Sequence, residues 1–203
     1  MSVEKSKNPI NEYPVGIIYK TNQMIKNILV LIFSFCLTAC FSQNDIKENS
    51  DEFINSQIES KIPDLKSLVE SNVMNPFTKK LYSDFAIDTF RIGYYFRNKN
   101  RKVPVNYKQQ VDLVKHVTSR YEKIINKYYQ LLKTKSTETQ KKALIKSQNA
   151  WEIFKKEESL WILTRLRDDW FDYNYYLDYC NIMKQRMIIL FDCYIDFEEH
   201  GNY

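Results

Sequence analysis

The chain has 203 residues, of which 30 are basic and 25 acidic, so its net charge is +5 with histidine neutral. This balance is that of neither a strongly acidic nor a strongly basic protein. Only three residues are glycine, which argues against a sheet protein with tight turns and favours long helices. The length suits one domain with a hydrophobic core.

Residues 24–40 are arranged like an export signal. Lys26 precedes the apolar run 28–33, and small residues then lead to Cys40, which is the order of charge, apolar core and cleavage site in secretory signals. The apolar core is shorter than the roughly 20 residues of a membrane span. Residues 37–40, with the sequence LTAC, resemble a bacterial lipoprotein signal. That resemblance implies cleavage before Cys40 and lipidation of its thiol, and an uncleaved N-terminal anchor is the alternative.

The segments on either side of this signal are polar. Residues 1–23 contain two prolines and fit no signal peptide, so we expect the true start at Met24 and a signal over 24–39. The segment 40–60 is rich in Ser, Asn, Asp and Glu, and we expect it to be a flexible, lipidated tether. A helical domain over 61–203 is expected to follow.

The expected location is the cell envelope. No aspartate directly follows Cys40, which by resemblance to the sorting rule of Gram-negative lipoproteins implies anchoring in the outer membrane, facing the periplasm. Loss of residues 1–39 would remove four lysines and two glutamates and lower the net charge to about +3. The membrane, reached through the lipid, is therefore an expected partner.

Helical patterns fill the rest of the chain. Pro63 and Pro76 each open a short helical stretch, and a basic run ending at Pro104 forms a loop. Beyond it, apolar residues recur at intervals of three and four along three long stretches, and Thr137 with Gln140 is spaced as a capping box before the second. The apolar positions are Val111, Val114, Val117, Tyr121, Ile124, Ile125, Tyr128, Leu131 and Leu132; then Leu144, Trp151, Phe154 and Trp161; then Tyr176, Tyr179, Met183, Met187, Leu190, Phe191 and Tyr194. We therefore expect an all-α, antiparallel up-and-down bundle of three long helices with shorter N-terminal helices.

Few residues carry the chemistry of catalysis. His116 and His200 have no partner at catalytic or metal-ligand spacing, and no zinc-protease, serine-hydrolase or phosphate-loop motif is present. Cys180 and Cys193 lie on one expected helix roughly 20 Å apart, too far for a disulfide. We expect both to be buried small apolar residues. No enzymatic activity, cofactor or metal is expected.

Charge is distributed unevenly along the long helices. Residues 120–146 carry eight basic and two acidic side chains, whereas residues 151–203 carry eleven acidic and six basic ones. Opposite charges on neighbouring helices assist antiparallel pairing, and the same patches would also suit an anionic polymer and a basic protein. Lysines interleaved with tyrosines are typical of nucleic-acid binding. Because an exported lipoprotein rarely meets nucleic acid, we expect no nucleic-acid partner.

The element Gln148-x-x-Trp151 stands at the centre of the stretch 129–190, between a tyrosine-leucine helix end and a downstream cysteine. With this pattern the stretch resembles the LprI-like lysozyme-inhibitor family of small exported bacterial domains, with the family-like part extending over about 105–200. Ser159 stands where many family members carry a cysteine, and no cysteine lies near Val111 to Val117, so a family disulfide is not expected. Met183 replaces the threonine expected from the family. The matching residues are Tyr129, Leu131, Leu132, Gln140, Leu144, Gln148, Trp151, Phe154, Glu157, Cys180 and Arg186.

The resemblance implies binding or inhibition of lysozyme. Acidic side chains of the last two helices would meet the positive surface of that basic enzyme, and tyrosines beside carboxylates suit a protein-binding surface. The expected partner-binding residues are Asp168, Asp169, Asp172, Tyr173, Tyr175 and Asp178. A structural or adaptor lipoprotein, binding another envelope component without inhibiting lysozyme, is the alternative. Trp151 is expected to be a core residue, since tryptophan buries a large apolar area.

Overall fold

The computed structural model describes residues 50–102, 107–165 and 171–200, and this part of the chain is helical with no strand. Cys40 and the expected signal lie outside it. None of the described helices is long and apolar enough to span a membrane. The five helices are α2 (Asp51–Asn72), α3 (Pro76–Lys102), α4 (Tyr107–Lys135), α5 (Glu138–Arg165) and α6 (Phe171–His200). The all-α prediction is confirmed.

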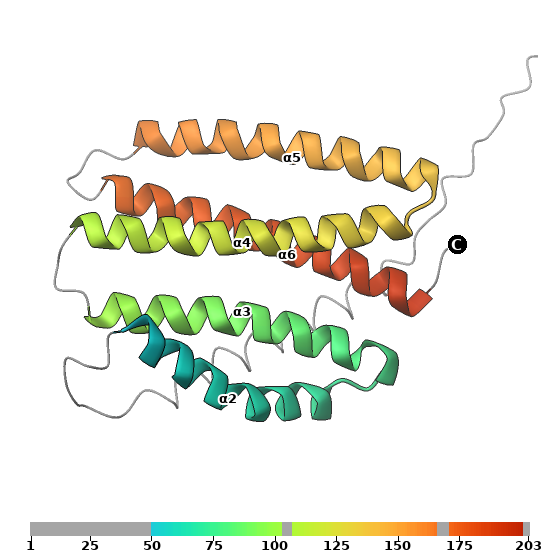
Figure 1. Ribbon diagram of the computed structural model, residues 1–203. Coiled ribbons are helices and arrows are strands. Elements are labelled where there is room, and N and C mark those ends of the chain that lie inside the picture. Colours follow the sequence, from blue (N-terminus) through green and yellow to red (C-terminus); the bar gives the residue numbers. More distant parts are fainter. Residues whose placement is uncertain (1–49, 103–106, 166–170, 201–203) are drawn as a thin grey trace, which may run out of the picture.

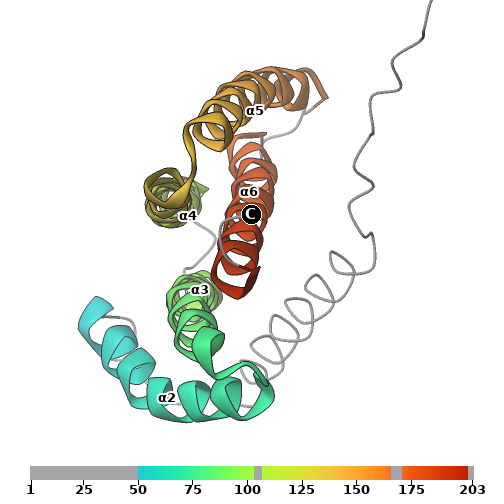
Figure 2. The same cartoon turned by 90° about the vertical axis from the view of Figure 1, so that its right-hand side faces the viewer.

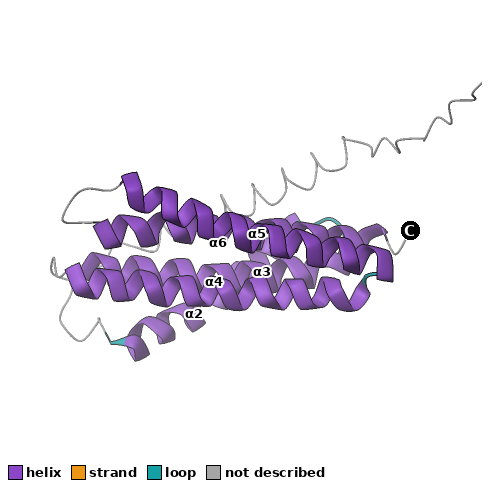
Figure 3. Ribbon diagram, turned by 90° about the horizontal axis from the view of Figure 1, so that it is seen from above, coloured by secondary structure: helices purple, strands orange, loops and turns teal. Residues whose placement is uncertain are grey.

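Successive helices run in opposite directions along the bundle (Figure 1). Viewed from the end, α3, α4 and α6 lie at the centre, with α2 outside α3 and α5 on the opposite side (Figure 2). From above, α3 to α6 extend along roughly one direction (Figure 3). The most extensive contact joins α4 to α6, which run parallel and are not neighbours in the chain. The up-and-down topology is as expected, but α3, with 27 residues, is a long helix rather than a short one.

Helix α2 begins about ten residues before the expected end of the tether. Ser50 caps it, because its Oγ accepts a hydrogen bond from the backbone N–H of Phe53 at 3.1 Å. Ile54 and Ile58 are buried in the core, so two apolar residues four apart anchor a stretch that is otherwise polar. Pro63 lies inside this helix rather than at its start.

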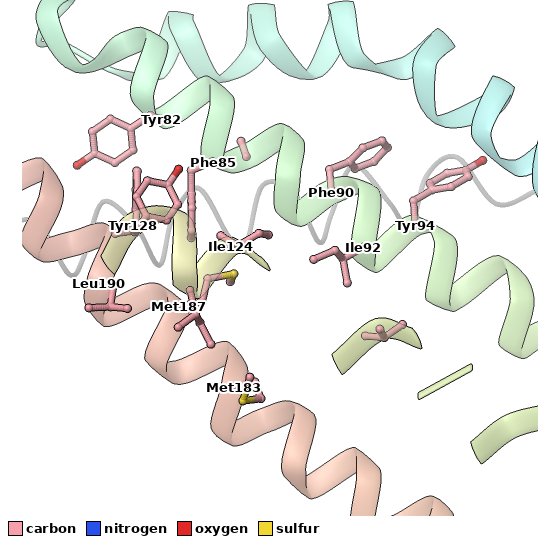
Figure 4. Close-up of a cluster of buried hydrophobic side chains, with 14 of the residues drawn as sticks. Tyr82, Phe85, Phe90, Ile92, Tyr94, Ile124, Tyr128, Met183, Met187 and Leu190 are labelled. Carbon is pink, nitrogen blue, oxygen red and sulfur yellow. The ribbon is translucent and has the colours of Figure 1, made fainter. Parts of the chain in front are cut away.

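The core is built where α3, α4 and α6 meet. The rings of Phe85 and Phe191 stack at 3.8 Å between centroids, and Tyr128 packs edge-on against Phe191 at 5.2 Å. Figure 4 shows these residues from α3 and α4 beside Met183, Met187 and Leu190 of α6. All of these side chains are buried. The helix faces that the three-and-four spacing predicted for α4 and α6 are therefore the ones that pack.

Helix α5 lies at the edge of the bundle. Its start is capped as expected, with the backbone N–H of Thr137 donating to Gln140 Oε1 at 2.9 Å. Trp151 is half-buried against the core, but Phe154 is 51% exposed and Trp161 is 53% exposed. Placing these last two in the core was wrong, because α5 touches the bundle along one narrow face and its aromatic side chains extend around the helix.

Candidate functional site

The buried guanidinium of Arg186 joins α6 to α5. The side chain is only 7% exposed. Its Nη2 donates to Gln148 Oε1 at 2.9 Å and its Nε donates to the same oxygen at 3.3 Å. Both Nη atoms also approach Ser147 Oγ at 3.5 Å. Two residues of the predicted motif, 38 positions apart in the chain, are thus in direct contact.

Trp151 completes this cluster. The guanidinium of Arg186 lies 5.6 Å from the centre of its ring, and Lys155 Nζ lies 4.6 Å from it. A cation over an indole face is attracted by the ring's negative face. Trp151 is therefore close to two cations at the α5–α6 interface, and this expected core residue is half-buried against the core.

Acidic and amide groups hold the two cations in place. Lys155 Nζ pairs with Glu152 Oε2 at 2.6 Å, and Gln148 Nε2 donates to Glu152 Oε1 at 3.1 Å. Burial lowers the pKa of Arg186 below its usual value, and the nearby charge of Glu152 opposes that shift. The Lys155 pKa is raised: burial lowers it, but the hydrogen bond to Glu152 and the charge of Tyr179 outweigh that effect.

Sequence reasoning missed Lys155, Glu152 and Ser147. The signal was present in the spacing, since Glu152 follows Gln148 by one helical turn and Lys155 follows Trp151 by the same interval. The role of these contacts is structural: they orient the side chains of the cluster and pack α5 against α6. The Gln148 amide contacts both the Arg186 guanidinium and the Glu152 carboxylate, and its bonds to Arg186 tie the edge helix α5 to α6 at the centre of the bundle.

The remaining motif residues lie in several environments. Tyr129 is half-buried and Leu132 is fully buried in the core. Cys180 is buried, with its Sγ 2.8 Å from Thr118 Oγ1, and burial raises the pKa of its thiol. Phe154 and Glu157, by contrast, are exposed on α5. The motif thus combines one interhelical contact with core positions and two surface positions.

The two described cysteines are free thiols. Cys180 is buried as expected, and the prediction that it does not bridge Cys193 holds. Cys193, however, is exposed, so its expected burial was wrong. The residues Phe191 and Tyr194 on either side of it in α6 are buried, whereas Cys193 faces outward. The apolar spacing alone did not reveal which way Cys193 faces.

The expected partner-binding residues cluster around the start of α6. Asp168 and Asp169 lie outside the described residues, and the side chains of Asp172 and Tyr173 are not among the described ones. Tyr175 and Asp178 are both half-buried.

Tyrosines in this region pack on one another and on a lysine. The Tyr175 ring packs edge-on against Tyr176 at 5.0 Å and stacks near Tyr179 at 6.1 Å. Lys115 Nζ of α4 lies 5.0 Å from the centre of the Tyr176 ring. Some of the tyrosines near the start of α6 therefore pack on one another and on a lysine of α4, at the edge where α4 and α6 meet.

Within the described ranges, no group of three or more His, Cys, Asp or Glu side chains is placed to hold a metal ion. Comparison of the chain with protein-family models, with curated proteins and with solved structures finds no match. The geometry of the described residues is thus the basis for assigning a function.

Proposed function

We propose that the protein is a lipid-anchored envelope protein whose helical bundle binds another envelope protein, and that lysozyme is the partner to test first. The observation that carries this proposal is the contact of Arg186 with Gln148 and Trp151. These three residues belong to the motif that resembles the LprI-like family, so their contact supports the resemblance from which envelope binding is inferred. Fold and motif together do not transfer an activity, so inhibition needs its own test.

The start of α6 supports a basic partner. Tyr175 and Asp178 lie one turn apart there and are partly accessible. Tyrosine offers contact area with a polar tip, and a carboxylate complements a positive surface. The proposal also includes Asp168, Asp169, Asp172 and Tyr173, which precede these two residues in the sequence.

An adaptor role without lysozyme inhibition is the second proposal. It is favoured by the outward side of α5, where large apolar side chains are exposed instead of packed. Contiguous exposed apolar residues on a protein surface mark interaction sites. The exposed residues on this helix are Ile145, Ile153, Phe154, Leu160 and Trp161.

A lysozyme activity assay with the purified full chain separates the two proposals. Inhibition at micromolar concentration, weakened by Asp178→Asn and unaffected by Asp64→Asn on the exposed side of α2, would support lysozyme as the partner. A folded protein that leaves lysozyme fully active would reject inhibition and leave the adaptor role. Mass analysis of the chain isolated from cells tests the anchor, because Cys40→Ser should abolish acylation.

A further inference from the structure

Three carboxylates face one another near the C-terminal end of α6, and they form the acidic cluster Asp192, Asp196 and Glu199. The charges of Asp196 and Glu199 both act on Asp192. Glu198, on a different side of the helix, is neutralised by Lys135 of α4 at 2.6 Å. Among the described residues, no lysine or arginine forms an ion pair with the acidic cluster. The His200 ring lies one turn after Asp196, with its Nδ1 3.2 Å from the Asp196 backbone oxygen.

The N-terminal part of α3 lies against this cluster. Figures 1 and 2 both place the start of α3 beside the end of α6. Thr78 Oγ1 donates to Glu199 Oε1 at 3.2 Å, and Asn75 Nδ2 approaches the same oxygen at 3.4 Å. Tyr82 follows Thr78 by one turn of the same helix, so its side chain meets α6 next to Glu199.

Tyr82 supplies an independent indication of a ligand. Its side chain is 0% exposed, and its hydroxyl has no hydrogen-bond partner among the described residues. Its ring packs edge-on against Phe191 at 5.4 Å, and its hydroxyl is turned toward the C-terminal part of α6 (Figure 4). Burial first, and then the charges of Glu199, Asp192 and Asp196, raise the pKa of this hydroxyl. The hydroxyl therefore lies on the side of α3 that faces the C-terminal part of α6, near the acidic cluster.

Two carboxylate oxygens beside Tyr82 are in the same condition. Asp192 Oδ1 and Asp196 Oδ1 are buried without a partner among the described residues. Buried polar atoms are normally hydrogen-bonded, and each that is not costs free energy. Three such atoms, two of them on carboxyl groups that influence one another, would be satisfied by a donor with several N–H groups and a positive charge. An ammonium or a guanidinium has this chemistry.

The rim of the cluster indicates that the cation belongs to a polypeptide. Met74 is 96% exposed and Phe77 is 86% exposed, and they adjoin Asn75 and Thr78, the two residues that contact Glu199. A small free polyamine would leave these apolar side chains uncovered. A polypeptide can cover them while one of its charged side chains enters the cluster, as in interfaces with an apolar anchor beside a charge pair.

We propose that the acidic cluster, together with Tyr82, receives a lysine or arginine side chain of a basic polypeptide partner. The carboxylates of Asp192 and Asp196 accept from the N–H groups of the incoming cation, and Phe77 packs against the adjoining part of the partner. This site lies at the opposite end of α6 from the residues proposed above to meet lysozyme, and it stands or falls independently of lysozyme inhibition.

Calorimetric titration of the purified full chain with three probes tests the proposal: hexalysine, a peptide of alternating lysine and leucine, and spermidine. We expect both peptides to bind and the alternating one to bind more tightly. Asp192→Asn and Asp196→Asn should each weaken peptide binding about tenfold, the loss of one hydrogen bond between charged groups. Asp64→Asn, which removes the same charge from the exposed side of α2, should change binding less than about twofold, because exposed charges are screened by salt.

Two further variants separate binding from folding. Tyr82→Phe removes only the hydroxyl, so it should leave the melting temperature unchanged or raised and still weaken peptide binding. Phe77→Ser should abolish the advantage of the alternating peptide over hexalysine. Equal losses from Asp192→Asn and Asp64→Asn would overturn the site, as would no binding of either peptide. Spermidine binding as tightly as the alternating peptide would overturn the assignment to a polypeptide.

Discussion

The hydrogen bonds between Gln148 and Arg186 predict how much the attachment of α5 contributes to stability. The Gln148 amide oxygen accepts from Arg186 at 2.9 and 3.3 Å, and the guanidinium is buried. Gln148→Ala removes that acceptor and leaves the buried charge with only its 3.5 Å approaches to Ser147 Oγ. A hydrogen bond to a charged group is worth about 1.5 to 3 kcal/mol, so the free energy of unfolding should fall by about 2 to 3 kcal/mol.

Urea denaturation followed by circular dichroism measures this loss, and it corresponds to a fall in melting temperature of roughly 4 to 12 °C for a chain of this size. The matched control is Gln130→Ala, which makes the same substitution at an exposed position of α4. That control should stay within about 0.5 kcal/mol of the unaltered protein. If Gln148→Ala also stayed within that range, the hydrogen bonds would not be holding α5.

A double-mutant cycle assigns the loss to the Gln148–Arg186 pair. Arg186→Met keeps most of the side-chain volume and removes the charge, a replacement that is often tolerated at buried ionic sites. In that background Gln148→Ala should cost less than about 1 kcal/mol, because no buried charge is left without an acceptor. Equal costs in both backgrounds would refute the coupling.

Three more predictions follow from individual side chains. Trp151→Ala should lower the free energy of unfolding by about 2 kcal/mol, less than the 3 to 5 kcal/mol of a fully buried aromatic, because Trp151 is half-buried; a loss above 4 kcal/mol in urea denaturation would contradict its place at the edge. Thr137→Ala should cost about 1 kcal/mol by removing the α5 capping box, and an unchanged melting temperature would argue against that cap. Burial, reinforced by Asp196 and Glu199, raises the pKa of Asp192 to about 6. Its folded-state pKa thus exceeds the unfolded one, so the contribution of Asp192 to stability is fully present below about pH 4 and is lost as pH rises through about 6. Asp192→Asn should make that fall shallower in melting curves across this range, and an unchanged slope would contradict the shift.

The buried faces of the central helices α4 and α6 could be predicted from the sequence. Along α4 and α6 the apolar residues recur so regularly that one face is defined, and Tyr128 and Phe191 of those faces lie at the centre of the core. Periodicity identifies a buried stripe well when that stripe is wide. The same reasoning could not find the start of α2, because residues 51–60 hold only three apolar residues, Phe53, Ile54 and Ile58, and the burial of the two isoleucines depends on packing against α3.

Helix α5 shows why an edge helix is harder to read. Ile153 and Phe154 are consecutive, and so are Leu160 and Trp161, so apolar side chains extend around the helix instead of along one stripe. Sequence spacing reports which residues are apolar, whereas the bundle decides which of them find a partner. Trp151 packs at the interface and Phe154, less than one turn later, points away from it.

For the candidate site, the residues that belong to it could be predicted from the sequence, but the contacts between them could not. The family resemblance grouped Gln148, Trp151 and Arg186, but their contact depends on the rotation of α5 against α6, which no local pattern encodes. The acidic cluster was visible only as an excess of acidic residues toward the C-terminus. Its pairing with Tyr82 requires α3 to lie along the end of α6, a contact between segments more than a hundred residues apart.

The middle and the C-terminal end of α6 therefore differ in how their charges are used. At its middle, the cation of Arg186 is buried but bonded to Gln148 and stacked on Trp151, so its burial is compensated within the chain. At its C-terminal end, the buried oxygens of Asp192 and Asp196 have no such compensation among the described residues. A compensated buried charge stabilises the bundle, whereas an uncompensated one costs stability unless something outside the chain binds there. That contrast is why the Arg186 cluster is assigned to holding the fold and the acidic cluster to recognising a partner.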